Sequence, residues 1–564
     1  MQLTDLAARK RGDVDYQKLV FDYTRHPDQD ATTPIRRPVV VVGAGPVGLA
    51  LAIDLAQREI PVVILDNDNT LSTGSRAICF AKRTLEIFDR LGCGDRMVDK
   101  GVSWNVGKVF FKDEQVYHFD LLAEVGHSRP AFINLQQYYV EGYLAERAAQ
   151  LPLIDLRWKN KVVGVEQHGD HVTLTVDTPD GHYRVEADYV AACDGGRSTM
   201  RQLMGQESKG QIFRDRFLIA DVKMAYDGPA ERWFWFDPAF HPNQSVLLHR
   251  QPDGVWRIDF QLGWTANPDE EKKPENIIPR VKALLAHSAM KDAKFELEWA
   301  SVYTFACLRM DRFRHGRVIF AGDSAHGVSP FGARGANSGV QDAENLAWKL
   351  AAIMNKQASD ALLDTYADER EYAADENIRN STRATDFITP KSDISRLFRD
   401  AVLELSKSHP FARTLVNSGR LSVPATLHGS TLNTPDAESF AGRMVPGAAA
   451  ADAPVVSADG TGSWLLRELG TGFTALIAQS PDDDELVRSI RSAVAGPVKV
   501  LRVANGSTAS PGDVVDAQGL VTQRYDLRPG TVYLFRPDQH VCARWRNPTV
   551  TQVKSALQRA LAVA

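Results

Sequence analysis

Three short segments contain the residues of this sequence best suited to hold a charged cofactor. They are 43–48 (Gly-Ala-Gly-Pro-Val-Gly), 193–198 (Cys-Asp-Gly-Gly-Arg-Ser) and 322–326 (Gly-Asp-Ser-Ala-His). Glycine lets a backbone approach a phosphate closely, and a carboxylate accepts hydrogen bonds from sugar hydroxyls. The segments lie far apart in the chain, so we expect a fold that brings them around one ligand.

The first segment has the glycine spacing of a dinucleotide-binding turn. Its first glycine makes the turn from strand to helix, its second admits a pyrophosphate, and its third lets the helix pack closely on the strand. The N-terminus of that helix stabilises the negative charge of the phosphates. A carboxylate at the end of the next strand can accept hydrogen bonds from a ribose. These features predict cofactor contacts from Gly43, Gly45, Pro46, Val47, Gly48, Asp66 and Asn67.

The hydrophobic pattern around this segment predicts the βαβ unit that such a turn requires. Residues 38–43 form a continuous apolar run ending in glycine, as a buried parallel strand should. Residues 47–58 show helical spacing of apolar positions, and residues 60–65 form a second buried strand. One unit of this kind binds either FAD or NAD, so the first segment alone does not separate the two.

Strand-rich and helical regions alternate along the rest of the chain. Residues 161–190 alternate apolar and polar positions, which predicts two or three antiparallel strands. Residues 212–303 are rich in aromatic residues and strand formers, which indicates a separate antiparallel sheet. We expect a further strand at 317–321 and a helix at 341–356.

The three segments together resemble those of the class A flavoprotein monooxygenases, the aromatic hydroxylase family that includes p-hydroxybenzoate hydroxylase and phenol hydroxylase. The resemblance covers residues 38–355 and includes the glycine-rich stretch 332–339 (Gly-Ala-Arg-Gly-Ala-Asn-Ser-Gly). The segment 76–79 (Arg-Ala-Ile-Cys) is nearest to the 3-(3-hydroxyphenyl)propionate hydroxylase branch. The resemblance implies an α/β and β architecture, in which a Rossmann-like FAD-binding domain carries an inserted antiparallel-sheet substrate domain and a C-terminal thioredoxin-like domain.

The resemblance also implies which residues contact FAD. In this family the Asp-Gly pair of the second segment lies by the pyrophosphate and takes part in binding both FAD and NAD(P)H. The aspartate of the third segment contacts the ribitol, and the glycine-rich stretch lies over the isoalloxazine. A helix starting near Gly335 would direct its N–H groups at the flavin N1–C2=O edge and favour flavin reduction. The implied contacts are Arg76, Gln137, Asp194, Gly195, Gly322, Asp323, Pro330, Gly335, Ala336 and Asn337, of which Arg76 and Gln137 could also be surface or capping residues.

The implied activity is hydroxylation of a phenolic compound through a flavin C4a-hydroperoxide, with NADH or NADPH as transient reductant and O2 as co-substrate. The sequence has one glycine-rich dinucleotide turn, so no second Rossmann domain holds the pyridine nucleotide. Two alternatives keep FAD. One is another FAD-dependent oxidoreductase on the same scaffold, such as an oxidase or a reductase, and the other is a non-catalytic flavin-binding sensor. A halogenase is disfavoured because its Trp-x-Trp-x-Ile signature is missing.

The sequence does not identify the base that would deprotonate a phenol. Phenol hydroxylases place an aspartate a few residues before the stretch that corresponds to 83–86, whereas this chain has Ala-Ile-Cys at 77–79. His249, Tyr303 and His241 lie in the expected substrate sheet and are catalytic candidates, although each also suits a packed or surface position. Arg334, in the glycine-rich stretch, would add a cation near the flavin or a substrate carboxylate, or would face solvent.

An aromatic run at 233–236 (Trp-Phe-Trp-Phe) has two interpretations. Its rings could stack on an aromatic substrate. Alternation of the same kind suits a strand with one face in a core, and we favour that interpretation.

The length of 564 residues predicts several domains. We expect an N-terminal extension, the first part of the FAD-binding domain, the substrate sheet, the return of the FAD-binding domain with helices, and the thioredoxin-like domain. Their ranges are 1–37, 38–205, 206–310, 311–440 and 441–564, with a linker at 433–454. The last domain lacks a pair of redox cysteines, so we expect it to be structural.

Composition excludes several classes of protein. An apolar fraction of 44% and a charged fraction of 24% are typical of a globular protein, and a net charge of -5 gives no reason to expect a nucleic-acid partner. Five cysteines without metal-like spacing predict a reducing compartment and no metal site. We find no signal-peptide pattern or membrane span, and therefore expect a cytoplasmic protein. The expected partners are a small phenolic substrate and, from the resemblance, a second copy in a homodimer.

Overall fold

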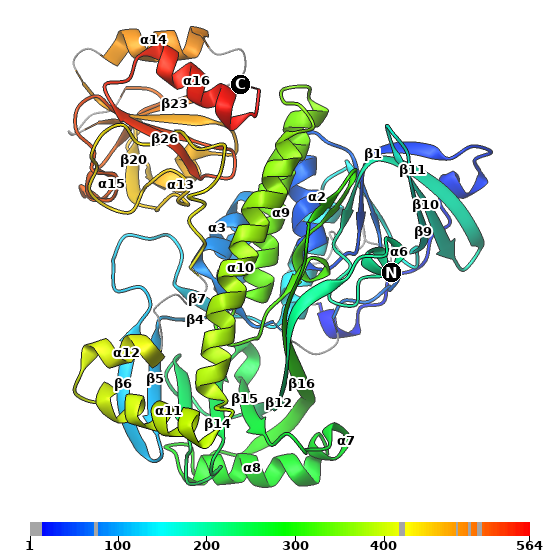
Figure 1. The fold of residues 1–564 in the computed structure, drawn as a ribbon, viewed down its shortest axis with the longest axis vertical. Helices are drawn as coiled ribbons and strands as arrows, with labels where there is room; N and C mark the ends of the chain where they lie inside the picture. The colour runs from blue at the N-terminus through cyan, green and yellow to red at the C-terminus, as the bar shows by residue number, and fades with distance from the viewer. Residues whose placement is uncertain are drawn as a thin grey trace.

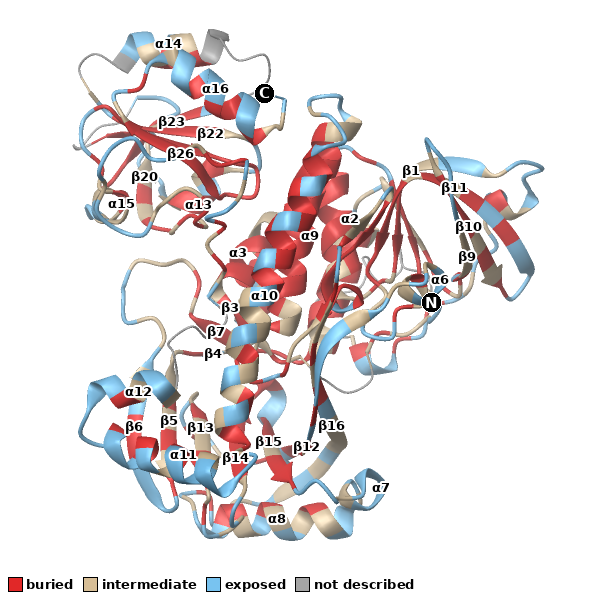
Figure 2. Ribbon diagram, viewed as in Figure 1, coloured by how far each residue is buried: buried red, intermediate tan, exposed pale blue. Residues whose placement is uncertain are grey.

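The computed structural model describes residues 14–72, 77–416, 423–480, 483–493, 498–504 and 510–563. Figure 1 shows an α/β lobe crossed by long helices, a lower lobe built on a second sheet, and a C-terminal lobe above. Buried residues fill the interior of each lobe and much of the long helix α9 (Gly335–Met354) (Figure 2). In the described part of the chain, no helix is long and apolar enough to cross a membrane.

The α/β lobe contains an eight-stranded sheet with the order β17-β18-β11-β1-β2-β8, extended from β11 by β10 and β9. The central strand β1 (Ile35–Val42) runs parallel to β11 and β2, and its residues 39–42 are 0–6% exposed. Apolar runs of this kind form strands that are covered on both faces. The other strands are β2 (Val62–Leu65), β8 (Ile154–Arg157), β9 (Lys161–Gln167), β10 (Val172–Thr178), β11 (Gly181–Ala192), β17 (Arg314–His315) and β18 (Val318–Phe320).

Two helices against this sheet position the cofactor segments. Helix α2 (Pro46–Gln57) follows β1, as predicted, and packs against α9. Helix α9 begins at Gly335, the start expected for the helix beside the flavin. The apolar spacing alone placed this helix at 341–356, because the first turn (Gly-Ala-Asn-Ser) carries no large apolar residue that would reveal the period. The remaining helices of the lobe are α3 (Lys82–Leu91), α4 (Gly94–Lys100), α5 (Gln137–Ala149), α6 (Thr199–Leu203) and α10 (Leu362–Ile388).

Residues 14–37 pack onto the α/β lobe. The Phe21 ring stacks on Trp158 with centroids 4.6 Å apart, and the buried Tyr16 hydroxyl donates a hydrogen bond to Glu146. A small sheet with the order β3-β7-β4 belongs to the same lobe. Its strands are β3 (Cys79–Ala81), β4 (Val102–Trp104) and β7 (Phe132–Asn134).

The lower lobe is built on a second eight-stranded sheet with the order β19-β16-β12-β15-β14-β13-β5-β6. Its strands pair antiparallel except β13 with β5, and β5 and β6 come from residues 106–120, far from the rest in sequence. Helix α8 (Pro274–Ala286) covers one face through Ile277, Val281 and Leu284. The other elements are β5 (Val106–Phe111), β6 (Glu114–Asp120), β12 (Ser208–Met224), β13 (Arg232–Phe236), β14 (Ser245–Arg250), β15 (Val255–Leu262), α7 (Pro268–Glu271), β16 (Phe295–Met310), β19 (His326–Gly327), α11 (Asp393–Ser406) and α12 (Pro410–Val416).

The C-terminal lobe has a seven-stranded sheet with the order β21-β20-β24-β23-β22-β25-β26. Strands β22 and β23 run parallel, whereas β25 and β26 pair antiparallel. The segment 433–454, expected as a linker, instead packs on this sheet: Ala449 pairs with His540, and Gly447 N–H donates to the Val541 carbonyl over 2.7 Å. Its elements are β20 (Pro454–Ser457), β21 (Gly462–Trp464), α13 (Leu465–Leu469), β22 (Thr474–Ala478), α14 (Asp483–Ala493), β23 (Lys499–Ala504), β24 (Val514–Val515), α15 (Leu520–Tyr525), β25 (Thr531–Phe535), β26 (Val541–Arg546) and α16 (Val550–Ala560).

Candidate active site

The glycines of the first segment occupy three different environments. Gly43 has φ +105°, and a Cβ atom there would lie 2.6 Å from the Cys193 carbonyl oxygen. A Cβ at Gly48 would lie 2.0 Å from the Gly43 carbonyl oxygen, so this position holds the helix close to the strand. Among the described residues, no atom lies within 4 Å of a Cβ built at Gly45, the position at which a pyrophosphate approaches the backbone. The turn therefore has the close packing and the open side that nucleotide binding requires.

Asp66 lies at the end of β2, beside this turn. Its carboxylate accepts hydrogen bonds from the backbone N–H groups of Ala44 at 2.6 Å and Asp68 at 2.8 Å. Burial of the carboxylate raises its pKa, an effect that these two hydrogen bonds oppose. Asn67, next to it, is exposed. The position at the strand end is the one from which an acid reaches a ribose.

The second segment forms a tight turn after β11. The Asp194 carboxylate accepts hydrogen bonds from Ser198 Oγ at 2.6 Å and from Met200 N–H at 2.9 Å, which fixes the start of α6. Gly195 has φ +76°, and a Cβ there would meet nothing within 4 Å. Arg201 donates to the Gly196 and Ser324 carbonyl oxygens at 2.7 and 2.8 Å. Arg201 thereby joins the second segment to the third.

The first and third segments meet at Val47, whereas the second segment meets the first where Gly43 packs on Cys193. Gly322 has φ +66°, and a Cβ there would lie 2.9 Å from Val47 Cγ2. A Cβ at Gly339, on α9, would lie 2.7 Å from the same atom and 3.1 Å from the Gly322 Cα. Gly322 N–H also donates to the buried Asp342 carboxylate at 3.0 Å. The close packing of these glycines converts three distant sequence segments into one site.

The N-terminus of α9 is fixed to the edge of the small sheet by one side chain. Asn337 Oδ1 accepts the Ala81 N–H at 2.8 Å, and Asn337 Nδ2 donates to the carbonyl oxygens of Cys79 at 2.9 Å and Ala333 at 2.6 Å. The positive end of the helix macrodipole is therefore held beside β3. A flavin ring with negative charge at its N1–C2=O edge would be stabilised at this helix end.

The residues present fit FAD. Open space borders Gly45, Gly195 and Gly196, where a diphosphate needs backbone approach, and helices α2 and α9 each begin at this site. Asp323 and Pro330 are exposed. Gln137 begins α5 and donates to Ser72 Oγ at 3.0 Å and Glu141 Oε1 at 2.8 Å. Arg76 lies outside the described residues.

A row of polar side chains crosses the second sheet on the face opposite α8. The strand register places Asp221 opposite Arg257, Arg257 opposite His249, and His249 opposite Arg232. Directly paired residues point to the same face of a sheet, so the four side chains form one row. Asp259 follows two residues after Arg257 on the same face. This row was missed in the sequence, apart from His249, because a single charged residue within an apolar strand does not reveal its neighbours.

Several atoms in this polar row are buried without a hydrogen-bond partner. In the described part of the chain these are Arg232 Nε, His249 Nδ1, Gln251 Oε1 and Asp259 Oδ1. Arg257, in contrast, donates two hydrogen bonds of 2.8 Å to the Asp221 carboxylate. Burial raises the pKa of Asp259 to about 6 and, with the two arginines, lowers that of His249 well below its ordinary value. Buried polar atoms are normally paired, so this row indicates a ligand site.

The polar row lies near the N-terminus of α9, where the flavin ring is predicted to bind. Burial raises the pKa of Cys79 to about 11, and the charges of Arg232, Arg257 and Asp259 also act on this thiol. Cys79, Ala230 and Ala333 each pack against the buried cluster of the small sheet, so the start of β13 and the loop before α9 border the same cluster. Asn337 bonds to the Cys79 carbonyl oxygen, and the charge of Arg232 acts on the Cys79 thiol, so Cys79 lies between the predicted flavin site and the polar row.

An aromatic wall continues from the polar row on the same face. Phe331, just before the glycine-rich stretch, packs edge-on against Phe217 and Phe305, with centroids 4.9 and 5.2 Å apart. Tyr303 lies opposite Phe217 in the register and contacts Phe305 at 5.4 Å. Such a wall excludes water and can stack on an aromatic ring.

The remaining candidates occupy other places. His241 hydrogen-bonds the Gln261 carbonyl oxygen at 2.7 Å and contacts Phe260, whose ring belongs to the face covered by α8. Arg334, which could have faced solvent, is 5% exposed and donates to Asn377 Oδ1 at 2.9 Å. In the aromatic run 233–236, Trp233 and Trp235 pack on the α8 side, while the two phenylalanines point to the opposite face. The two tryptophans therefore belong to the face of the strand that packs in a core, as the favoured interpretation of this run expects.

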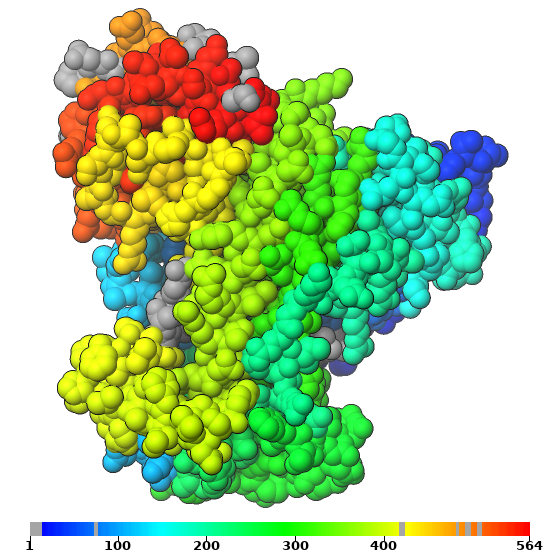
Figure 3. Space-filling model, viewed as in Figure 1, coloured from blue at the N-terminus to red at the C-terminus, as the bar shows by residue number. Residues whose placement is uncertain are grey.

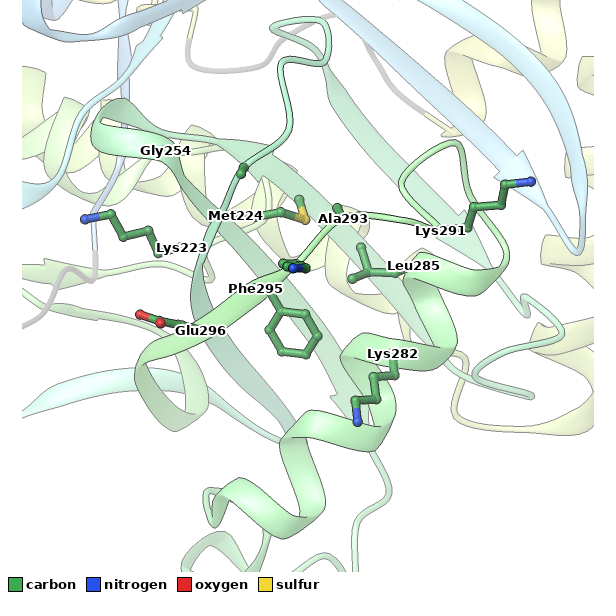
Figure 4. Close-up of a pocket in the computed structure, with 11 residues that line it drawn as sticks. Lys223, Met224, Gly254, Lys282, Leu285, Lys291, Ala293, Phe295 and Glu296 are labelled. Atoms are coloured by element: carbon green, nitrogen blue, oxygen red, sulfur yellow. The ribbon is translucent and has the colours of Figure 1, made fainter.

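A large cavity of about 890 Å³ lies away from these segments, between the ends of β12 and β16 and helix α8 (Figure 4). Its polar lining is mainly lysine, and Figure 4 shows Lys223 and Lys291 pointing apart rather than toward a common centre. Its lining includes none of the cofactor segments, and we therefore assign the site to the polar row and the α9 end.

A family model described as an FAD binding domain matches residues 36–381. The chain belongs to this family. Curated relatives of this FAD-binding protein include 3-(3-hydroxy-phenyl)propionate/3-hydroxycinnamic acid hydroxylase 2 of Burkholderia vietnamiensis, 29% identical over 531 residues (90% of this chain and 94% of the relative). Another is a probable NADH-specific resorcinol 4-hydroxylase of Rhodococcus jostii, 34% identical over 343 residues (59% and 62%). The predictions of an FAD-dependent monooxygenase and of FAD as cofactor are confirmed.

Solved structures give the same fold for this FAD-binding protein. The flavin-dependent monooxygenase PieE, in complex with FAD and substrate, superposes with a TM-score of 0.77 at 21% identity, covering 94% of this chain and 100% of its own. Aklavinone-11 hydroxylase with FAD and aklavinone superposes with a TM-score of 0.73 at 23% identity, with the same coverage. The mixed α/β architecture predicted from the sequence is confirmed at this level.

Proposed function

We propose that this protein hydroxylates the aromatic ring of a phenolic compound, using NADH or NADPH and O2. The observation that carries the proposal is the packing of the first cofactor segment against the other two, with Gly43 on Cys193 and Val47 on Gly322. Phe331, shortly before the N-terminus of α9, packs against the aromatic face of the second sheet. The printed names of the relatives, which are hydroxylases of hydroxyphenylpropionate and of resorcinol, support a phenolic substrate.

Bound FAD would accept a hydride and activate O2. The protein residues bind FAD, orient the substrate and exclude water. The turn at Gly45 and the N-terminus of α2 bind the pyrophosphate, and Asp66 accepts hydrogen bonds from the ribose. The N-terminus of α9, fixed by Asn337, stabilises negative charge on the ring system. Phe217, Phe305 and Phe331 orient the substrate ring and exclude water.

NADH is the reductant that we test first, because the Rhodococcus jostii relative is named NADH-specific. Anaerobic stopped-flow measurement follows flavin bleaching with NADH and NADPH, alone and with 3-(3-hydroxyphenyl)propionate, resorcinol and simpler phenols. Acceleration by a phenol supports the hydroxylase. Fast reduction without any aromatic compound would favour a reductase or oxidase, and no reduction under any condition would favour a flavin-binding sensor.

We further propose that residues 441–564 form a thioredoxin-like domain with a structural role. The parallel pair β22 and β23 and the antiparallel pair β25 and β26 support this assignment. Its cysteine, Cys542, is buried, and burial raises the thiol pKa to about 12, which disfavours redox chemistry. Figure 3 shows this lobe as a distinct body against the end of α9 and α10.

We also propose a homodimer formed through α11 and α12, which lie at the surface in Figure 3. Their outward faces carry apolar side chains that are 44–81% exposed: Ile394, Leu397, Phe398, Leu405, Phe411 and Leu415. Exposed Arg396 and Glu404 lie on α11, so two antiparallel copies would pair opposite charges across a two-fold axis. Light scattering should give twice the 62.3 kDa chain mass for the wild type and less for Leu397→Glu. A monomeric wild type contradicts this proposal.

A further inference from the structure

We infer that Asp259 is the group that accepts the proton of the phenolic substrate, and that Arg232 binds the phenolate oxygen so formed. This inference rests on the proposed function and assigns the base that the sequence alone does not identify. Residues 77–79 (Ala-Ile-Cys) carry no carboxylate. Asp259 lies on the sheet face that the register directs away from α8, toward Cys79.

Two of the four unpartnered atoms of the polar row match a phenolic hydroxyl in kind. A phenolic hydroxyl donates one hydrogen bond and accepts others, so its site needs at least one acceptor and one donor. Asp259 Oδ1 is the buried acceptor, and Arg232 Nε is the buried donor. A bare carboxylate ligand would satisfy the arginine and leave the Asp259 oxygen unpaired. The mixed set therefore favours a hydroxyl group over a carboxylate at this place.

Arg232 has the environment of a residue that awaits an anion. It is 8% exposed, and in the described part of the chain no carboxylate lies within ion-pair distance of its guanidinium. Burial lowers its pKa, while the charge of Asp259 acts on it from a longer distance. A buried guanidinium without a direct partner is costly unless a ligand supplies the charge. A phenolate would be that ligand.

The position suits a substrate whose ring must lie next to the flavin. Ala230, just before β13, and Ala333, in the loop that precedes α9, pack against the same buried cluster of the small sheet as Cys79. Phe331, on the other side of the same loop, begins the aromatic wall. A phenol whose hydroxyl reaches Arg232 and Asp259 would thus lie between the aromatic wall and the N-terminus of α9.

The proton transfer balances without any further reagent. The phenolic O–H bond breaks, the proton moves to Asp259 Oδ1, and the electron pair stays on the phenolate oxygen, where the guanidinium of Arg232 stabilises it. The charged and titratable groups that face Asp259 are Arg232, Arg257, Asp221, His249 and Cys79. Of these, His249 Nε2 lies 3.8 Å from Asp259 Oδ2, and the loss of a proton from His249 is already favoured by burial. His249 is a positioning residue that keeps one side of the carboxylate occupied.

The test measures phenolate formation and proton release together. 4-Nitrophenol is added to the oxidised holoenzyme in weak buffer with an indicator dye, at a pH above the Asp259 pKa of about 6 and below that of the probe. We expect the wild type to form bound nitrophenolate without releasing a proton, because Asp259 retains it. Asp259→Asn should either form at least tenfold less nitrophenolate or release one proton for each nitrophenolate formed. Arg232→Met should lose the nitrophenolate signal.

Matched variants separate this role from a structural one. Asp259→Glu should restore nitrophenolate formation without proton release. Asp215→Asn removes a buried carboxylate of the same sheet that pairs with Lys391, and it should behave as the wild type when its FAD content is normal.

Three results would overturn the inference. One is a wild type that releases one proton per nitrophenolate, and the other is an Asp259→Asn variant that matches the wild type in both signals. A wild type whose flavin reduction responds to phenols but which binds no 4-nitrophenol also counts against it. Absence of any phenol effect on flavin reduction by NADH or NADPH is a different result, because that result rejects the proposed function itself.

Discussion

Two buried charge clusters in this protein differ in how completely their members are paired. The interdomain cluster joins Lys349 of α9 and Glu369 of α10 to Arg536 and Asp538 of the C-terminal lobe, and all four side chains are 0–1% exposed. Lys349 donates to Glu369 at 2.8 Å, and Arg536 contacts both acids at 2.5–3.2 Å. The polar row of the second sheet instead leaves Arg232 Nε and Asp259 Oδ1 without partners.

The difference separates a cluster that holds domains together from one that binds a ligand. A cluster whose charges are all paired gains little from an added molecule, and breaking it leaves a buried charge uncompensated. A cluster with unpaired donors and acceptors costs stability in the free protein and recovers it only when a ligand binds. Stability and activity should therefore respond in opposite ways to mutations in the two clusters.

The largest effect is expected from Glu369→Gln in the interdomain cluster. It leaves Lys349 and Arg536 buried with one carboxylate fewer, and removing one partner of such a cluster costs about 3–5 kcal/mol. Thermal unfolding should show a markedly lower Tm, with FAD bound and without it. An unchanged Tm would mean that this cluster is not a structural joint. Asp368→Asn, which removes an exposed acid of α10 beside Arg312, is the control and should have little effect.

Arg232→Met tests the polar row, where we expect activity to fall without a loss of stability. The free protein should keep its Tm or gain slightly, because a buried cation without a direct partner is removed. Phenol-stimulated flavin reduction should fall by about 10²-fold, the usual contribution of a positioned group of this kind. Loss of both stability and activity would place Arg232 with the structural cluster. Arg232→Lys keeps the charge and should recover part of the activity.

The pH dependence of stability should differ in sign between the clusters. Arg536 and Lys349 hold the pKa of Glu369 far below its usual value, so its contribution is present at neutral pH and is lost as pH falls below about 4.5. Asp259 has a raised pKa, from 3.8 to about 6, so the folded state binds the proton more tightly than the unfolded state. Stability from Asp259 therefore falls as pH rises between these two values.

Asp259→Asn should remove that fall. Relative to the wild type, the variant should become more stable as pH rises from about 4 to about 6, by about 2 kcal/mol at most, since each pKa unit corresponds to about 1.4 kcal/mol. Chemical denaturation at several pH values measures the difference. A constant difference across this range would show that the Asp259 carboxyl titrates normally in the folded protein.

The sequence predicted the βαβ unit of the α/β lobe, because both strands and the helix between them form where they were expected. The runs at 38–43 and 60–65, the glycine spacing and Asp66 are local signals, and local signals survive in any fold that contains the unit. The segment 433–454 was misjudged because its small residues resemble a linker, whereas they permit the close packing of its backbone against β26.

The polar row of the second sheet could not be predicted from the sequence, because its members come together only through strand register. Arg232 and Asp259 are each ordinary charged residues in the sequence, and a shift of one residue in either strand would point the side chain to the α8 face. His249 was singled out by its type alone. The joining of β5 to β13 is equally invisible, since these strands are separated by more than a hundred residues of chain. A charged residue within an otherwise apolar strand was the available signal, and Arg257 and Asp259 in Val-Trp-Arg-Ile-Asp-Phe show it twice.

The smallest expected effect sharpens the comparison at the level of a single hydrogen bond. Trp348 Nε1 donates to Asp538 Oδ2 over 3.1 Å, and Trp348→Phe removes this donor while keeping a large aromatic ring in the core. Arg536 and Asn345 continue to donate to the same oxygen, so Asp538 stays paired and the cost should be about 1 kcal/mol. Tm should fall by a few degrees at most, and flavin reduction should be unchanged. A loss comparable to that of Glu369→Gln would show that the ring, rather than the charges, joins the C-terminal lobe to α9.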